Sequence, residues 1–154
     1  MFQYNKDFSY EEKMSDSLII TSEHTKEEYK QICEKLLKHN YENTNGLLNK
    51  PGIDIYLLLK ENDKIIGAIS CDTFNMCMYI DVLWLDKEYR GLGYGKKLIS
   101  QAEKIAKENG CIFSHTCTYN YQSPDFYKAC GYEVFGEISD YPNGIIQYFL
   151  KKKL

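Results

Sequence analysis

The residues with the clearest chemical meaning form a glycine-rich loop, Arg90-Gly91-Leu92-Gly93-Tyr94-Gly95, which Lys96 follows. An apolar run precedes the loop and an amphipathic segment follows it, which predicts a strand, a turn and a helix. Glycine adopts positive φ at little cost and lets a ligand approach the backbone. The first turn of a helix adds unpaired N–H groups and the positive end of the helix dipole. The loop therefore predicts a site for phosphate or pyrophosphate.

Two familiar phosphate-binding loops do not fit this spacing. In a Walker A loop, Arg90 would have to be glycine and Lys97 would have to be Ser or Thr. The Rossmann fingerprint would need glycine at position 96 or 98, where the chain has Lys96 and Leu98. Neither ATP nor a dinucleotide is the natural interpretation of the loop.

The spacing Arg-x-x-Gly-x-Gly after a strand resembles the GNAT acetyltransferase superfamily, whose loop of this kind holds the pyrophosphate of acetyl-coenzyme A. The run from Leu83 to Gly91 is similar to the family's apolar strand, acidic turn and Tyr-Arg-Gly passage. Downstream, Asn120 to Tyr132 resembles the second motif, Asn-x-x-Ala-x-x-Phe-Tyr-x-x-x-Gly-Phe/Tyr, with Ser123 in place of alanine. The resemblance is strong over about residues 64–138, with both motifs in the family's order.

Length and composition fit one ordinary globular domain. The chain has 154 residues, 44% of them apolar, and a formal net charge of −3, so no basic field favours nucleic acid. We expect residues 1–14 to form a flexible N-terminal extension and residues 15–154 to form a single acetyltransferase domain.

The location expected from the sequence is cytoplasmic. The first 13 residues are too polar for a signal peptide, and no apolar run approaches the ~20 residues of a membrane span. The six cysteines include no Cys-x-x-Cys pair, and most lie in apolar runs, which favours a reducing compartment and no structural zinc.

Hydrophobic periodicity and turn residues predict the order of the elements. Strands are predicted at 18–22, 55–60, 65–71, 76–85, 112–118, 132–138 and 145–150. Helices are predicted after a capping box at Thr25 and Glu28, in a short helix and loop within 41–52, at 94–109 and at 123–130. This order matches the fold that the resemblance implies: α/β (α+β), with a mixed, mostly antiparallel sheet of six to seven strands and helices on both faces.

Two residues are the predicted catalytic groups. Asp81 lies on the central strand where many family members carry a catalytic Glu, and a carboxylate there would be costly to bury without a purpose. The alternative is a strand residue that faces solvent or pairs with a lysine. Tyr127 has, by resemblance, the role of protonating the departing thiolate; the alternative is a tyrosine packed in the core.

The remaining site residues also come from the resemblance. The main chain of Leu83 and Leu85 is expected to bond the pantetheine arm and the thioester oxygen, the loop to bind the pyrophosphate, and Asn120 to bond the pantetheine. The predicted cofactor-binding residues are Leu83, Trp84, Leu85, Arg90, Gly91, Leu92, Gly93, Tyr94, Gly95, Lys96 and Asn120. Ser123 is expected to cap the helix that carries Tyr127.

No metal site is expected, because His24, His39 and His115 have no partner at ligand spacing. His115 adjoins the predicted site and is a candidate proton relay. The expected partner is an amine-bearing acceptor, a small molecule or a peptide, with no nucleic acid and no membrane, and a homodimer is left open. In the fold that the resemblance implies, the acceptor is expected between the early helices and the last hairpin, at about residues 40–52 and 139–145.

The first functional hypothesis is an N-acetyltransferase that moves the acetyl group of acetyl-CoA directly to a primary amine in a ternary complex. The second is a catalytically silent acyl-CoA-binding sensor or interaction module. A nucleotide phosphohydrolase is a third possibility, and it would require stronger stabilisation by ATP than by acetyl-CoA.

Overall fold

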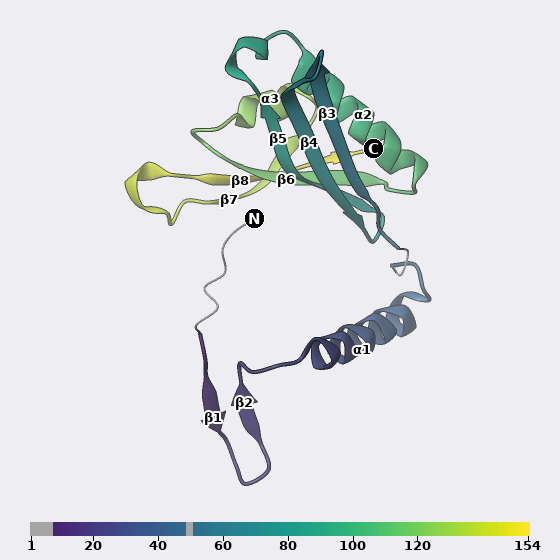
Figure 1. Cartoon of the computed structure of the whole chain (residues 1–154), viewed down its shortest axis with the longest axis vertical. Helices are drawn as coiled ribbons and strands as arrows, with labels where there is room; N and C mark the ends of the chain where they lie inside the picture. The colour runs from purple at the N-terminus through teal and green to yellow at the C-terminus, as the bar shows by residue number, and fades with distance from the viewer. Residues whose placement is uncertain (1–7, 49–50) are drawn as a thin grey trace. The chain divides into compact units, whose positions relative to one another are not determined.

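The computed structural model describes residues 8–48 and 51–154 (Figure 1). Their contacts separate two compact units, Met1–Gly46 and Leu47–Leu154. In the first unit, β1 (Glu11–Lys13) and β2 (Ile19–Thr21) form an antiparallel hairpin. Strand β1 falls within the segment expected to be a flexible extension; residues 1–7 lie outside the described residues, and that expectation stays a prediction.

Helix α1 (Lys26–Thr44) begins at the predicted capping box. The Thr25 hydroxyl accepts from the Glu28 N–H at 3.2 Å, and the Glu28 carboxylate accepts from the Thr25 N–H at 2.7 Å. The capping box is therefore confirmed.

The separate short helix predicted within 41–52 is wrong, because α1 continues through this sequence to Thr44. Polar side chains in its last turn bond back to the preceding turn instead of breaking the helix: Asn43 donates to the His39 carbonyl at 2.8 Å, and Thr44 to the Asn40 carbonyl at 2.7 Å. The helix ends at Asn45, whose φ of 49° is left-handed. Residues 49–50 lie outside the described residues.

The second unit is built on a six-stranded sheet with the order β3-β4-β5-β6-β8-β7. Its strands are β3 (Asp54–Glu61), β4 (Lys64–Phe74), β5 (Cys77–Leu85), β6 (Phe113–Tyr119), β7 (Glu133–Ile138) and β8 (Gln147–Lys153). Strands β5 and β6 pair in parallel, and the other neighbours pair antiparallel. A parallel pair needs a crossover, which α2 (Tyr94–Glu108) provides. The mixed, mostly antiparallel sheet is confirmed.

Helices α2 and α3 (Pro124–Ala129) cover the same face of this sheet. Glu103 of α2 forms an ion pair with Lys152 of β8 at 2.7 Å, and Tyr132, which follows α3, donates to the Ser114 hydroxyl of β6 at 2.9 Å. Ser114 and Lys152 are partners in the β6–β8 register, so their side chains share one face. The predicted helix on the second face stays a prediction.

The core lies between this face and α2. The apolar stripe of α2 supplies four buried side chains to it, namely Leu98, Ile99, Ala102 and Ala106. This stripe is the helical pattern read from the sequence, so the α2 prediction is confirmed.

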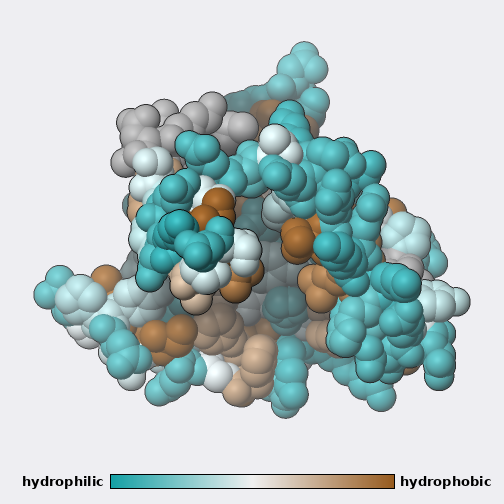
Figure 2. Space-filling view, turned by 90° about the horizontal axis from the view of Figure 1, so that it is seen from below, coloured by the Kyte–Doolittle hydropathy of each residue, from teal (hydrophilic) through white to brown (hydrophobic). Residues whose placement is uncertain are grey.

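The visible surface is mixed in polarity. Hydrophilic residues cover most of the face in Figure 2, and apolar residues show as separate patches among them. No helix in the described part of the chain is both long enough and apolar enough to cross a membrane.

Candidate active site

The site begins where β5 and β6 stop pairing. Their parallel register runs from Cys77 and Phe113 to Ile80 and Thr116. Beyond this point β5 stays paired with β4 and β6 with β8, and Figure 1 shows the two halves of the sheet diverging. The Thr116 hydroxyl donates to the Ile80 carbonyl at 2.9 Å at the last paired position. We call the residues at and after this position, from Ile80 to Leu85 and from Thr116 to Tyr119, the β5–β6 fork.

A β-bulge places Asp81 in this fork. Val82 pairs with Ser70 and Ile80 with Cys71, so Asp81 is an extra residue in β5 with no partner in β4. A bulge bends a strand and redirects its side chains, and the Asp81 side chain is exposed. The expectation of a costly buried carboxylate therefore does not hold, and no ion pair among the described residues uses Asp81.

The backbone of Leu83 and Leu85 faces away from β4, into the fork. The Asp86 N–H donates to the Ile66 carbonyl at 2.9 Å. Hydrogen-bonded positions alternate along an antiparallel strand, so Trp84 also bonds β4, whereas Leu83 and Leu85 direct their N–H and C=O groups to the other side. The Leu85 carbonyl accepts there from Arg90 Nε at 2.9 Å. The polar backbone of Leu83 is thus available to an extended ligand with amides.

The glycine-rich loop joins β5 to α2. Gly91 and Gly93 have φ of 77° and 84°, and a methyl group added to either would meet no atom within 4 Å. Gly95 differs, because a methyl group there would lie 3.0 Å from the Phe126 ring. Gly93 caps α2 without a side-chain hydrogen bond, so the first N–H groups of the helix have no intrahelical partner. Open space above two glycines, next to free N–H groups, fits a pyrophosphate.

Arg90 and Tyr89 hold the loop against the strands. The Arg90 guanidinium lies 4.7 Å from the centre of the Trp84 ring. Trp84 itself is 57% exposed. The Tyr89 hydroxyl donates to a carboxylate oxygen of Glu61 at 2.6 Å. That hydrogen bond raises the pKa of Tyr89 to about 12. The other predicted loop residues, Leu92 and Lys96, are exposed and Tyr94 is half-buried.

Tyr127 lies on the covered face, at the same fork. It is 8% exposed and packs edge-to-face against Phe126 and Tyr132. Burial raises its pKa above the ordinary tyrosine value, and hydrogen bonding with Thr116 opposes that rise. Because Thr116 marks the end of β5–β6 pairing, the phenol is placed where the strands separate.

Helix α3, which carries Tyr127, begins differently from the prediction. Ser123 precedes the helix, but its side chain makes no capping hydrogen bond, so its predicted cap is wrong. Pro124 occupies the first turn, where its fixed φ suits a helix and its missing N–H costs nothing.

Asn120 is engaged within the protein. Its amide donates to the Gly144 carbonyl at 2.9 Å and accepts from the Ile146 N–H at 3.3 Å, which ties the end of β6 to the segment before β8. One amide hydrogen remains for a ligand. Among the described residues, no group of three or more His, Cys, Asp or Glu could hold a metal ion.

Thr116 and the bulge were missed by sequence reasoning. The available signal for Thr116 is the alternation of hydroxyl residues along β6, where Ser114, Thr116 and Thr118 are all buried. The bulge has no comparable local signal, because only the pairing with β4 defines it.

Comparison with known proteins agrees with this geometry. Residues 14–132 match the model of the acetyltransferase (GNAT) family. Blasticidin-S acetyltransferase of Streptomyces morookaense is 44% identical over 95 residues, which cover 61% of this chain and 70% of that protein. A crystal structure of an acetyltransferase from Bacillus cereus ATCC 14579 superposes with a TM-score of 0.75 at 32% identity, over 86% of this chain and 96% of the other.

A further crystal structure, a putative streptothricin acetyltransferase from Bacillus anthracis in complex with acetyl coenzyme A, has a TM-score of 0.61 and 29% identity. The match covers 71% of this chain and 67% of that one. The family match spans the fork, the glycine-rich loop and Tyr127, and from it we conclude that this chain belongs to the acetyltransferase (GNAT) family and uses acetyl-CoA as its acetyl donor.

Proposed function

We propose that this enzyme acetylates a primary amine by direct attack of the amine on acetyl-CoA while both substrates are bound. The observation that carries the proposal is the β5–β6 fork, which brings together an exposed carboxylate, an available backbone and a buried phenol. Bound acetyl-CoA supplies an acetyl group activated as a thioester. The residues that would hold it are the Arg90–Lys96 loop, through its N–H groups, and the main chain of Leu83 and Leu85.

The Tyr127 phenol is proposed to assist the departing sulfur. A phenol near pKa ~10 is a weaker acid than a thiol near ~8.5, so full proton transfer in water would cost roughly 2 kcal/mol at ~1.36 kcal/mol per unit. Burial raises the pKa of Tyr127 and increases this cost. Tyr127 therefore donates a hydrogen bond as charge develops on sulfur, and proton transfer is completed late.

Asp81 is proposed to take the proton of the attacking amine, directly or through water. A primary amine with pKa ~10.4 is almost fully charged at neutral pH and cannot attack until it loses a proton. We expect Asp81→Asn to lower kcat/KM for the acceptor about 100-fold at pH 7. Activity of the variant should then rise about tenfold per pH unit as the free amine fraction grows, whereas the wild-type profile stays flatter. Parallel pH profiles for the two proteins would remove Asp81 from this role.

The acceptor is proposed to be a small molecule, because relatives of this chain are named for blasticidin-S and streptothricin. The test is release of free thiol from acetyl-CoA with a panel of blasticidin S, streptothricin, simple mono- and diamines, and peptides with free N-termini. We expect turnover with at least one small amine and none with the peptides. Binding of acetyl-CoA without turnover across the panel would instead support the silent acyl-CoA sensor.

A further inference from the structure

Three hydroxyl residues of β6 form a buried row that ends in the fork: Ser114, Thr116 and Thr118. Side chains alternate along a strand, so these three lie on one face of the sheet, the face that α2 and α3 cover, with roughly 7 Å between successive groups. Burying a hydroxyl is unfavourable unless it forms hydrogen bonds. The partners of each hydroxyl therefore indicate what it does.

The chain that follows β6 supplies a partner to each end of this row. The Thr118 hydroxyl donates to Gln122 Oε1 at 2.9 Å, and the Tyr132 hydroxyl donates to Ser114 at 2.9 Å. The later partner meets the earlier hydroxyl, so this chain runs back along β6. A residue midway between the two partners is therefore expected at the middle hydroxyl.

Tyr127 is that midway residue, and Thr116 is the middle hydroxyl. The Tyr127 and Tyr132 rings pack edge-to-face at 5.8 Å between centres, close to the spacing of the hydroxyls along β6. Burial raises the pKa of Tyr127, and hydrogen bonding with Thr116 opposes that rise, which is the contact that this geometry predicts.

The Thr116 hydroxyl has one proton, and its nearest acceptor is a carbonyl of β5. Its Oγ1 lies 2.9 Å from the Ile80 carbonyl oxygen and 3.4 Å from that of Cys117. A hydroxyl that donates its proton in this way still has a free lone pair, so it accepts from the Tyr127 phenol. In the resting enzyme the Tyr127 proton is therefore directed at Thr116.

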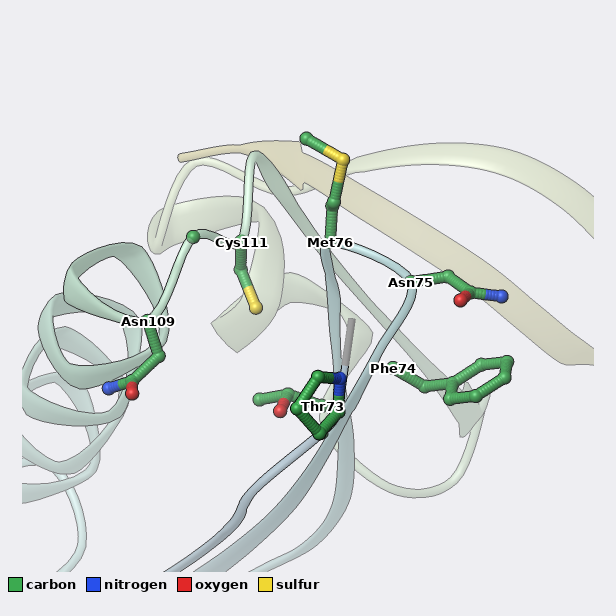
Figure 3. A pocket seen from close by; sticks show the side chains of 9 residues that line it. Thr73, Phe74, Asn75, Met76, Asn109 and Cys111 are labelled. Carbon is green, nitrogen blue, oxygen red and sulfur yellow. The ribbon is translucent and has the colours of Figure 1, made fainter. Parts of the chain in front are cut away.

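Main-chain hydrogen bonding, and not a side chain, fixes the other end of the β5–β6 pair. The Ile112 N–H donates to the Met76 carbonyl at 2.8 Å. Figure 3 shows Met76 with Cys111 at this end, around a pocket of about 10 Å³, room for one water molecule and not for a substrate. Because the strands are joined here, the Thr116 proton can turn away from Ile80 without separating them.

The other groups that act on the Tyr127 phenol oppose a negative charge on it. Burial has the largest effect on the Tyr127 pKa and raises it, and three thiols, Cys71, Cys130 and Cys117, raise it further. Among these causes, hydrogen bonding with Thr116 is the one that lowers the Tyr127 pKa. Negative charge that develops on the Tyr127 oxygen is therefore stabilised by the Thr116 hydroxyl.

We propose that Thr116 is a positioning residue for Tyr127, whose hydroxyl accepts from the phenol in the resting enzyme and donates to the phenol oxygen during acetyl transfer. This rests on the proposed function. As the C–S bond of the thioester breaks, the Tyr127 proton passes to the sulfur and forms the S–H bond. The Thr116 hydroxyl turns from Ile80 to the phenolate and keeps its own proton.

The protons balance over one turnover. The attacking amine loses one proton to Asp81, and the sulfur gains one from Tyr127. Asp81 then releases its proton to water, and Tyr127 takes one from water. Thr116 neither loses nor gains a proton, so it acts only through Tyr127.

The test is a double-mutant cycle on kcat with the best acceptor of the panel. Thr116→Val keeps the branched shape and removes the hydroxyl. We expect kcat to fall about tenfold, the effect of one hydrogen bond to a charged group, with the acetyl-CoA KM unchanged. In a Tyr127→Phe enzyme the same substitution should change kcat less than about twofold, because the phenol through which Thr116 acts is absent.

Conservative and matched variants separate this role from packing. Thr116→Ser keeps the hydroxyl and should hold kcat within about threefold of wild type. Thr116→Ala differs from Thr116→Ser only by the hydroxyl, so this pair gives the same comparison if valine disturbs the fold. Ser114→Ala removes a hydroxyl of the same row outside the fork, and it should lower stability while kcat stays within about threefold.

Two results would overturn the role of Thr116 and leave the proposed function intact. One is wild-type kcat in folded Thr116→Val and Thr116→Ala enzymes. The other is an equal fall in kcat with and without the Tyr127 hydroxyl, which would mean that Thr116 acts independently of Tyr127. Unchanged kcat in Tyr127→Phe, or absence of turnover with every panel acceptor, would instead overturn the proposed function and the role of Thr116 with it.

Discussion

Replacement of Tyr127 by phenylalanine is expected to lower kcat by about 100-fold or more, the usual contribution of a general acid, with the acetyl-CoA KM nearly unchanged. The phenylalanine ring keeps the packing against Phe126 and Tyr132, and only the hydroxyl at the fork is lost. The leaving sulfur then departs without a hydrogen-bond donor. Free-thiol release at saturating acetyl-CoA measures the effect, and an unchanged rate would remove Tyr127 from the mechanism.

The neighbouring Tyr132 supplies the control. It is also buried and packs against Tyr127 at 5.8 Å between ring centres, but its hydroxyl donates to Ser114, away from the fork. Tyr132→Phe should therefore lower stability and leave kcat within about threefold of the wild-type value.

The pH dependence of kcat is a second test of Tyr127. Because burial raises the pKa of Tyr127, its O–H group remains a hydrogen-bond donor through neutral pH and is lost only as pH rises past the usual tyrosine range. The wild-type kcat should therefore fall at alkaline pH, and this fall in kcat should be absent from Tyr127→Phe.

Features set by nearby residues were predictable from the sequence. The capping box needs only Thr25 and Glu28, and helix α2 follows from a regular apolar stripe between Gly93 and Gly110. Gly110 has the expected left-handed φ, at 87°. The anion-binding character of the glycine-rich loop was also predictable from local sequence, because the glycine spacing and the start of the helix determine where N–H groups are unpaired.

Features that depend on pairing between distant strands were not predictable in this way. The end of β5–β6 pairing at Thr116 depends on the register of these two strands, and the bulge at Asp81 depends on the register of β4 and β5. The residue types within one strand do not indicate where either feature lies. The row of Asp72, Tyr79 and His115 has the same origin, since these residues become neighbours only through two strand pairings. For Asn120 the motif could be recognised from the sequence. Its hydrogen bond to the Gly144 carbonyl could not be predicted, because the two residues meet only in the folded chain.

Replacement of Gly93 by valine is expected to weaken acetyl-CoA binding about 100-fold. The side chain would occupy the open space above the loop, where no protein atom lies within 4 Å of the added Cβ, so the clash is with the ligand. A lost hydrogen bond to a charged group is worth ~1.5–3 kcal/mol, and ~1.4 kcal/mol corresponds to a factor of ten. Loss of one or two phosphate contacts therefore accounts for the expected change.

The fluorescence of Trp84 can measure coenzyme A binding. Trp84 is the single tryptophan of the chain and lies beside the loop with its ring against Arg90, so its fluorescence should respond when coenzyme A binds. Titration of wild type and Gly93→Val then gives both dissociation constants without any need for turnover.

A matched variant separates strain from steric blocking. Valine at positive φ is disfavoured wherever it occurs, by roughly 1–2 kcal/mol. Gly110 has a φ of 87°, close to the 84° of Gly93, but lies at the opposite end of α2. Gly110→Val should therefore lower the unfolding free energy by at least this strain while coenzyme A affinity stays near the wild-type value. Equal affinity losses in the two variants would mean that backbone strain in α2, and not a blocked pyrophosphate position, controls binding. Wild-type affinity in a folded Gly93→Val protein would place the pyrophosphate away from this loop altogether.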